Sequence, residues 1–326
     1  MMVAGVDPRW QRFRQGRIVV LGRVGMDLYA DPPGTRIEEA VRYVAAIGGS
    51  AGNIAVALAR QGIPAALLSR VSDDAVGRYC LAELARFGVD TAHVLTSGGE
   101  ARNSLAVVET RPSGAQTVLY RNGAADFALG ETDVEAVDFN DAAALVVTGT
   151  ALAREPSRGA TFAAMRRAKA AGAVVVLDVD HRAYSWATRD EAVRISLQAA
   201  TAADVVIGND DEFGLLAGDH DRGQGLARDL AGHGGLFTVY KRGPLGSVTY
   251  LSDRQFDTGI FPVDALKPMG AGDGFMGGLL AGLAQGHDLE TAVTRGAATA
   301  AIIVAGIGCA PASPDTAELD AFIRRF

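Results

Sequence analysis

Hydrophobic and polar positions along the chain define two kinds of segment that alternate. Short β-branched runs predict strands, and the alanine-rich stretches between them predict helices. The predicted strands are 17–21, 65–69, 144–147, 173–179, 204–207 and 236–240, and the predicted helices are 52–61, 74–87, 158–170, 189–201 and 223–231. Repeated strand–helix–strand units build a parallel sheet with helices on both faces. The pattern therefore predicts an α/β fold around a central, mostly parallel sheet.

Two segments break this rhythm. Residues 24–47 mix polar and apolar positions in short pieces, and residues 104–120 form two apparent strands around a turn at 111–114. Together they predict a small antiparallel sheet beside the main one, spanning about 24–47 and 102–121. Such a sheet can act as a lid that excludes water from a site. An ordinary surface hairpin explains the pattern equally well.

The length of 326 residues and the hydrophobic fraction of 48% suit one large domain, which we expect to span residues 17–326. Residues 1–16 contain arginines but no apolar stretch long enough for a signal sequence, so we predict a disordered leader there. The longest run of small apolar residues, 297–308, is well short of the roughly 20 residues that cross a bilayer. We expect no membrane attachment.

The net charge of −7 argues against nucleic acid as a partner, because such binding draws on lysine and arginine. Cys80 and Cys309 lie far apart and lack the spacing of a disulfide framework or a zinc site. They indicate a reducing, cytoplasmic compartment. The five histidines form no metal-ligating pattern, so no structural metal is expected.

The segment Met269–Phe275 has the strongest chemical pattern in the chain. Gly270, Ala271 and Gly272 are small, so their N–H groups can converge on an anion at the positive end of the following helix. Asp273 in the first turn can accept a hydroxyl proton while the neighbouring amides stabilise a phosphoryl group in transfer. The alternative is an aspartate that merely caps the helix after a glycine turn.

A second glycine-rich turn precedes a helix near the start of the chain. Gly48 and Gly49 would let a ligand approach the backbone, and Asn53 can exchange hydrogen bonds with hydroxyl groups. A glycine-rich cap of a tightly packed helix explains the turn nearly as well. The pair of turns is therefore more informative than either one.

Two stretches, GGSAGNIAVALARQG at 48–62 and KPMGAGDGFMGGLL at 267–280, resemble the two signatures of the PfkB (ribokinase-type) carbohydrate kinases. The resemblance extends from about residue 18 to 322. It implies a ribokinase-like fold and transfer of the γ-phosphate of ATP to a sugar hydroxyl, with Asp273 as the general base. The amides of Gly270 to Asp273 would then form the anion hole.

The same resemblance implies positions for the nucleotide and its Mg²⁺. Asn209 and Glu212 are similar to the family's NxxE motif and would hold Mg²⁺ through water; a solvated turn is the alternative. The candidate nucleotide contacts are Asn209, Lys241, Gly243, Gly246 and Ala301. Lys267-Pro268 stands where the family usually has an acidic residue and a threonine. This departure puts in doubt the monovalent-cation site that the family often builds nearby.

Within the family, GRVGMDLYA, SRGA and LDVDHRAYSW are most similar to kinases of inositol catabolism that act on 5-dehydro-2-deoxy-D-gluconate. This similarity implies a sugar acid phosphorylated on its terminal hydroxyl. Asp27 suits the hydroxyls, and Asp180 with Arg182 resembles a substrate-side loop. Candidates for the substrate carboxylate are Arg23, Arg121 and Arg182, since a guanidinium matches two carboxylate oxygens.

Two alternatives remain at this point. The enzyme could act on another acceptor: 2-keto-3-deoxygluconate, ribose, fructose or a nucleoside. The chain could instead be a non-catalytic sensor that binds sugar or nucleotide. An intact Asp273 argues against the sensor. Separately, the family resemblance implies a homodimer that forms through the lid.

Overall fold

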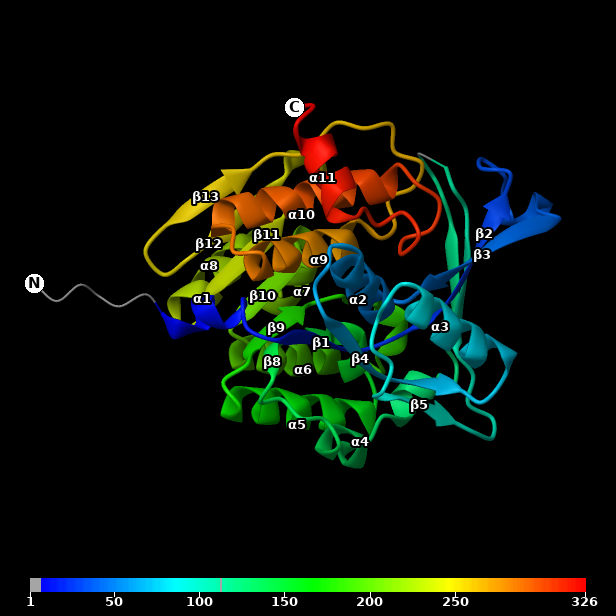
Figure 1. Ribbon diagram of the computed structural model, residues 1–326, viewed down its shortest axis with the longest axis horizontal. Coiled ribbons are helices and arrows are strands. Elements are labelled where there is room, and N and C mark those ends of the chain that lie inside the picture. The colour runs from blue at the N-terminus through cyan, green and yellow to red at the C-terminus, as the bar shows by residue number, and fades with distance from the viewer. Residues whose placement is uncertain (1–6, 112) are drawn as a thin grey trace, which may run out of the picture.

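A computed structural model describes residues 7–111 and 113–326 (Figure 1). Its larger sheet has nine strands within these residues. In spatial order they are β13 (Gln255–Thr258), β12 (Ser247–Tyr250), β11 (Phe237–Lys241), β10 (Val205–Asn209), β9 (Val174–Asp178), β8 (Ala142–Thr148), β1 (Arg17–Leu21), β4 (Ala65–Ser72) and β5 (Val94–Ser97). All neighbours pair in parallel except β11–β12 and β12–β13. The predicted parallel sheet is confirmed, whereas the strand pattern had missed the antiparallel edge at residues 247–258.

Helices cover both faces of this sheet (Figure 1). One face carries α1 (Pro8–Arg12), α2 (Ser50–Arg60), α3 (Ala75–Arg86), α9 (Ala271–Ala284) and α10 (Leu289–Val304), the last of which packs against α11 (Thr316–Ile323). The other face carries α4 (Glu131–Glu135), α5 (Ser157–Ala170), α6 (Arg189–Ala202), α7 (Asp210–Ala217) and α8 (Gly223–Gly232). The model therefore has three layers, with the sheet in the middle.

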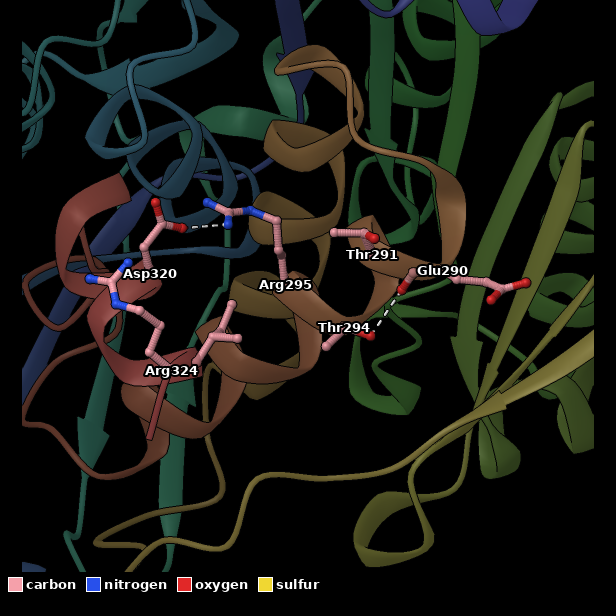
Figure 2. A pocket seen from close by; sticks show the side chains of 7 residues that line it. Glu290, Thr291, Thr294, Arg295, Asp320 and Arg324 are labelled. Carbon is pink, nitrogen blue, oxygen red and sulfur yellow. Dashed lines mark hydrogen bonds and ion pairs between the residues drawn. The ribbon is translucent and has the colours of Figure 1, made fainter. Parts of the chain in front are cut away.

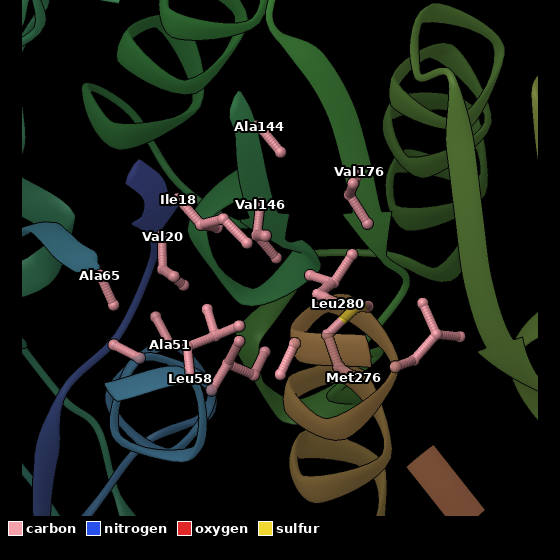
Figure 3. Packing of buried hydrophobic residues seen from close by; sticks show 14 of the residues in the cluster. Ile18, Val20, Ala51, Leu58, Ala65, Ala144, Val146, Val176, Met276 and Leu280 are labelled. Atoms are coloured by element: carbon pink, nitrogen blue, oxygen red, sulfur yellow. The ribbon is translucent and has the colours of Figure 1, made fainter. Parts of the chain in front are cut away.

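The central strands contribute side chains to two hydrophobic cores, one on each face of the main sheet. In β1, Ile18 and Val20 belong to the core under α2 and α9, while Val19 and Leu21 belong to the core under α5 and α6. Figure 3 shows the first of these cores, where side chains of several strands meet those of α2 and α9. A fully buried Val, Leu or Ile contributes roughly 1.5–3 kcal/mol. The unbroken hydrophobic runs of these strands follow from this burial on both faces.

A second sheet of four strands stands at one side of the main sheet (Figure 1). Its order is β3 (Arg42–Gly48), β2 (Gly25–Asp31), β6 (Ser104–Val108) and β7 (Thr117–Tyr120). The prediction of a small sheet from these two segments is confirmed. The predicted antiparallel arrangement holds for the outer pairs only, because β2 and β6 pair in parallel. These two strands are separated by β4 and α3, which provide the crossover that parallel strands require.

The prediction of a disordered leader over residues 1–16 is wrong for residues 7–16; residues 1–6 lie outside the described part of the chain. Asp7 caps the short helix α1 by accepting a hydrogen bond from the amide of Arg9 at 2.9 Å. The Trp10 ring stacks on Phe237 with centroids 5.5 Å apart, and Phe13 is fully buried. This segment therefore covers the edge of the core. Its many arginines had suggested an exposed segment at the sequence level.

Helix α9 lies unusually close to its two neighbours. A Cβ added to Gly277 would collide with Ala57 of α2, and one added to Gly278 would collide with Thr299 of α10. Gly282 has a similar close approach to Ala292, with 3.0 Å to its Cα. Because these glycines have no side chain, the backbone of α9 packs directly against α2 and α10. This close packing fixes the position of the first turn of α9. None of the helices in the described residues has the length and apolarity that a membrane span needs.

Candidate active site

A cleft of about 1340 Å³ lies between the carboxyl ends of the main-sheet strands and the small sheet. The strand ends contribute their last residues: Asp178 of β9, Asn209 of β10 and Lys241 of β11. The small sheet contributes Asp27 from β2 and residues of β7. Parallel α/β sheets bind ligands at this edge, because strand ends and helix N-termini meet there. Apart from Arg121, the polar residues predicted from distant parts of the sequence share this one cleft.

The predicted anion hole lies on the cleft at the mouth of α9. Gly270 has φ of 86°, a left-handed conformation that only glycine adopts readily, and it turns the chain into the helix. The N–H groups of Ala271, Gly272 and Asp273 belong to the first helical turn, where an α-helix has no carbonyl of its own to accept them. We call Gly270–Asp273 the anion-hole turn.

Lys241 supplies a positive charge beside this turn. A Cβ built on Gly272 would lie 3.2 Å from Nζ of Lys241, so the ammonium stands against the backbone of the turn. Ammonium, helix N-terminus and free amides all favour an anion at this point. The arrangement suits the phosphate of a nucleotide.

Asp273 lines the same cleft and is held by the other glycine-rich turn. Nδ2 of Asn53, in the first turns of α2, donates to Oδ2 of Asp273 at 2.7 Å. The two motifs from opposite ends of the sequence therefore meet through a side-chain hydrogen bond. This bond orients one carboxylate oxygen and leaves the other available for a substrate proton.

Burial raises the pKa of Asp273 to about 6, and the nearby carboxylate of Asp180 adds to the increase. The hydrogen bond from Asn53 and the charges of Arg182 and Arg23 act in the opposite direction. A base with a pKa near 6 is ionised at neutral pH and binds a proton more strongly than an ordinary aspartate does. Both properties favour general-base chemistry.

The acceptor side of the cleft is formed around Asp27. Tyr29 donates from Oη to Oδ2 of Asp27 at 3.2 Å. Burial raises the pKa of Asp27, and Arg23 opposes that shift. A Cβ on Gly48 would collide with the Asp27 carboxyl, so this glycine leaves room for the carboxyl without lining the cleft itself. Gly49 has φ of 87° and does line the cleft, as does Arg23.

Asp180 and Arg182 form an ion pair at the cleft, with 2.8 Å between Oδ1 and Nη2. Burial would raise the pKa of Asp180, but Arg182, Ser50 and Arg23 outweigh it and lower the value. Asp178 behaves differently, since burial raises its pKa well above the usual range and Lys241 only partly opposes this. Asp178 lines the cleft but was not among the candidate site residues. Its position two residues before Asp180, at the end of a buried strand, was the signal.

Arg121 occupies a different place from the one we predicted. It is not among the cleft-lining residues; its guanidinium pairs with Asp126, donates to the Thr150 carbonyl at 3.1 Å and to Oγ of Ser185 at 3.1 Å, and lies over the Phe127 ring. The side chain is buried in internal contacts at the root of β7. It therefore has a structural position and is no longer a candidate for the substrate carboxylate.

The predicted nucleotide contacts surround the far end of the cleft. Lys241 ends β11, and Gly243 and Gly246 follow that strand. Ala301 with its neighbours Ala297 and Ala300 presents a small-residue face of α10. These positions give a flat ligand access to the helix. Phe261 and residues 259–265 also line this end, and the sequence pattern had given no signal for them.

Asn209 and Glu212 lie on the cleft but use their oxygens within the protein. Oδ1 of Asn209 accepts from the Glu212 amide at 2.8 Å, and Oε2 of Glu212 accepts from the Asn209 amide at 2.7 Å, which caps α7. Oε1 of Glu212 accepts from the His181 amide at 3.2 Å. Each Glu212 oxygen already has a backbone partner, so this pair fits a hydrated Mg²⁺ held through water better than a directly ligated ion.

A smaller depression lies away from this cleft, between α10 and α11 (Figure 2). Its polar contacts join its own walls: Arg295 donates to Asp320 at 2.6 Å, and Thr294 donates to the Glu290 carbonyl at 2.9 Å. The first contact joins α10 to α11, and the second lies within α10. The depression therefore contributes to packing, and the chemistry belongs to the larger cleft.

Comparison with known proteins finds a family match over most of the chain. The model of the "pfkB family carbohydrate kinase" matches residues 15–316. The chain is 39% identical over 311 residues to 5-dehydro-2-deoxygluconokinase of Photobacterium profundum, covering 94% of each chain. It is 33% identical over 312 residues to the enzyme of the same name from Geobacillus kaustophilus, covering 94% of this chain and 93% of the relative.

Solved structures are similar over the same length. A PfkB protein from Polaromonas sp. has a TM-score of 0.80 at 30% identity, covering 94% of this chain and 99% of that one. A fructokinase from Vibrio cholerae, solved with fructose, ADP and a potassium ion, has a TM-score of 0.83 at 27% identity, covering 95% and 99%. The predicted ribokinase-like fold is confirmed. The chain belongs to the pfkB family of carbohydrate kinases and is an ATP-dependent carbohydrate kinase.

Proposed function

We propose that this kinase transfers the γ-phosphate of ATP to the terminal hydroxyl of 5-dehydro-2-deoxy-D-gluconate, a step of inositol catabolism. The names of the relatives at 39% and 33% identity support this acceptor. The observation that carries the mechanism is Asp273, hydrogen-bonded to Asn53 at the mouth of α9 and on the cleft.

In the proposed reaction, Asp273 removes the proton of the acceptor hydroxyl as its oxygen attacks the γ-phosphorus. The bond from phosphorus to the β,γ-bridging oxygen breaks, and ADP leaves. The amides of the anion-hole turn and the Lys241 ammonium stabilise the negative charge on the transferred group. Asn53 holds the carboxylate in position, since its amide donates to the oxygen that does not receive the proton.

Mg²⁺ is the expected companion of ATP, and when bound it would neutralise phosphate charge. The engaged oxygens of Glu212 and Asn209 support a role for this pair in holding the water around the ion. Water-mediated binding suits Mg²⁺, which gives up its hydration shell reluctantly.

For the substrate carboxylate we favour Arg23 over Arg182. Arg23 is buried, donates from Nη1 to Ser104 at 3.2 Å, and its Nε has no partner among the described residues. The Arg182 side chain is 46% exposed and already committed to Asp180. A buried guanidinium with unused donors gains most from a carboxylate.

The acceptor is tested with purified protein, ATP and Mg²⁺, by measuring ADP release on a panel of acids and neutral sugars. We expect the highest kcat/KM with 5-dehydro-2-deoxy-D-gluconate and lower values with 2-keto-3-deoxygluconate, ribose, fructose and a nucleoside. The Asp273→Asn variant reveals any contaminating kinase. A higher kcat/KM on a neutral pentose or nucleoside would refute the proposed acceptor.

The arginine assignment has its own test. Arg23→Gln should raise the KM for the sugar acid about tenfold or more while leaving the KM for ATP nearly unchanged, because a charge-assisted contact to the acid is lost. Arg42→Gln, at an exposed arginine of the same small sheet, is the matched control. An equal KM for the acid in Arg23→Gln and wild type would remove Arg23 from the site.

We also propose a homodimer through the small sheet, in the cytoplasm. Large apolar side chains are exposed on its strands and at their ends: Val41, Tyr43, Val44, Val118 and Tyr120. They lie on or next to the two edge strands, β3 and β7. Large apolar side chains exposed in this way are typical of an interface. Both cysteines are free thiols, which suits a reducing compartment. Sedimentation velocity should give twice the monomer mass, and a monomer at micromolar concentration would contradict the dimer.

A further inference from the structure

Lys267 is a buried lysine directly behind the anion-hole turn. Its side chain is 1% exposed, and Nζ donates to the Met269 carbonyl at 2.9 Å and to the Ile303 carbonyl at 3.2 Å. Sγ of Cys309 lies 3.8 Å from the same nitrogen. Within residues 7–111 and 113–326, no carboxylate forms an ion pair with this ammonium. A charge in such a place is costly unless dipoles compensate it, so its retention needs a reason.

The two carbonyls belong to the two segments that form the anion hole. Met269 is the residue before Gly270, whose left-handed turn starts α9. Ile303 lies in the last turn of α10, and its carbonyl also accepts from the Gly306 amide at 3.2 Å. A Cβ on Gly270 would lie 3.2 Å from Cγ2 of Ile303 and would collide with Cys309. Lys267 therefore joins the start of α9 to the end of α10 at the point where they touch the turn.

The contacts of Nζ are those that a monovalent cation would have. Backbone carbonyl oxygens around a single positive charge, with no water access, are typical of potassium coordination. The Vibrio cholerae fructokinase to which the chain is similar was solved with a potassium ion. In this chain a side-chain ammonium already neutralises the carbonyls of Met269 and Ile303. The residues present do not fit an added cation here.

We propose that Lys267 is a positioning residue whose ammonium replaces a monovalent cation, holding the anion-hole turn in shape so that this kinase turns over without potassium. The inference rests on the proposed kinase chemistry of that turn. Lys267 borders the cleft but is only 1% exposed, and its ammonium is directed to two backbone carbonyls. In this proposal it acts through the Met269 carbonyl and the conformation of Gly270.

A chain of polar groups connects Lys267 with the acceptor side. Sγ of Cys309 lies 3.6 Å from Oη of Tyr29, which in turn donates to Asp27. Burial raises the pKa of Cys309 to about 11, with Lys267 opposing the shift, so the thiol stays neutral. One buried network of polar groups thus connects the anion-hole turn with the carboxylate of Asp27.

The first experiment measures the wild-type enzyme in tetramethylammonium buffer and in potassium buffer at equal ionic strength. We expect kcat and the KM for ATP to agree within about twofold, since the site is already filled by an ammonium. A requirement for potassium would overturn the proposal. No product with any acceptor in either salt would instead refute the kinase function.

The second experiment replaces the lysine. Lys267→Ala should lower kcat about tenfold or more, because the Met269 and Ile303 carbonyls lose their shared donor and the turn relaxes. Addition of potassium or methylammonium should restore part of the lost kcat, which a purely structural loss would not allow. Lys169→Ala is the matched control, since that lysine is an exposed partner of Asp204 outside the cleft.

The second experiment is read together with thermal unfolding. A folded Lys267→Ala enzyme with wild-type kcat in tetramethylammonium buffer would overturn the proposal, and so would a reduced kcat that no small cation restores. If this variant does not fold, Lys267→Arg, which keeps the charge, should fold and remain independent of potassium. A potassium requirement in Lys267→Arg would also count against it.

Discussion

The main sheet and the small sheet divide the site between them, and they differ in how firmly they are packed. Every residue of β8 is buried, whereas the first four residues of β3 are exposed. The proposed base and anion hole stand on α9, which is packed between two helices, while Asp27 stands on the small sheet. If the proposed roles are right, the chemistry that needs exact geometry is placed on the tightly packed main domain, and acceptor recognition on the sheet that has fewer contacts.

The largest effect on kcat should come from a substitution on the tightly packed helix α9. Asp273→Asn keeps the shape of the side chain but cannot accept the hydroxyl proton, so kcat should fall by roughly 10² to 10⁴. The affinity for nucleotide should be nearly unchanged, as measured by calorimetry with ADP. Retained turnover would show that the base lies elsewhere and would break the division of roles.

The connection between the two sheets is the next target. Arg121→Met leaves the buried Asp126 carboxylate without its ion pair at the root of β7, which should cost about 3–5 kcal/mol of unfolding free energy. The double variant Arg121→Met with Asp126→Leu removes both charges and should recover much of that loss. Chemical denaturation measures both. A loss below about 1 kcal/mol in the single variant would mean that the pair does not hold the small sheet.

The pH dependence tests the environment of the base. Asp273 has a pKa of about 6, so it is protonated and inactive below that pH and ionised above it. The value of kcat/KM should therefore rise about tenfold per pH unit up to pH 6 and level off above it. Initial rates between pH 4.5 and 8 give the profile. A profile that stays flat down to pH 4.5 would contradict the burial of this carboxylate.

A single methyl group probes the contact between Lys241 and the turn. Gly272→Ala should push the ammonium away from the turn and raise the KM for ATP roughly threefold to tenfold. The same change should stabilise the fold by up to about 1 kcal/mol, since alanine favours helix. Gly225→Ala in α8, where a Cβ meets open space, should give the stabilisation alone. Equal KM values in the two variants would show that Lys241 is not engaged there.

The smallest effect is expected on the outer surface of the small sheet. Val41 is 92% exposed, so Val41→Ser should change stability by no more than about 0.5 kcal/mol and leave kcat alone. If this surface is the dimer interface, the same variant should weaken association in sedimentation experiments. A change in kcat without a change in mass would mean that the surface serves the site directly.

The sequence was most informative where one physical rule dominated. Hydrophobic runs located the buried strands because burial on both faces leaves no polar position. The glycine turn with Asp273 was predicted as a site, and the structure places it on the cleft; the role of Asp273 as base stays a prediction. Asn53 was predicted near hydroxyls, and it reaches the site by holding Asp273.

The failures have a common origin in long-range contacts. Arg121 and Arg23 look alike in sequence, and only the fold shows that one meets Asp126 while the other faces the cleft. Lys267 appeared as a departure from the family pattern, and its partners at residues 269 and 303 could not be foreseen from spacing. The arginines of the leader hid two aromatic side chains, Trp10 and Phe13, that complete the core.

The close packing of α9 also limits how the substrate specificity of this enzyme could change by mutation. Positions such as Gly277 and Gly278 accept no larger side chain, so random substitution there yields misfolded protein rather than a new specificity. Variation should be better tolerated at exposed positions of the small sheet, such as the first four residues of β3. New acceptors should therefore be reached through mutations in residues 25–48 and 104–120, with the phosphoryl-transfer machinery inherited unchanged.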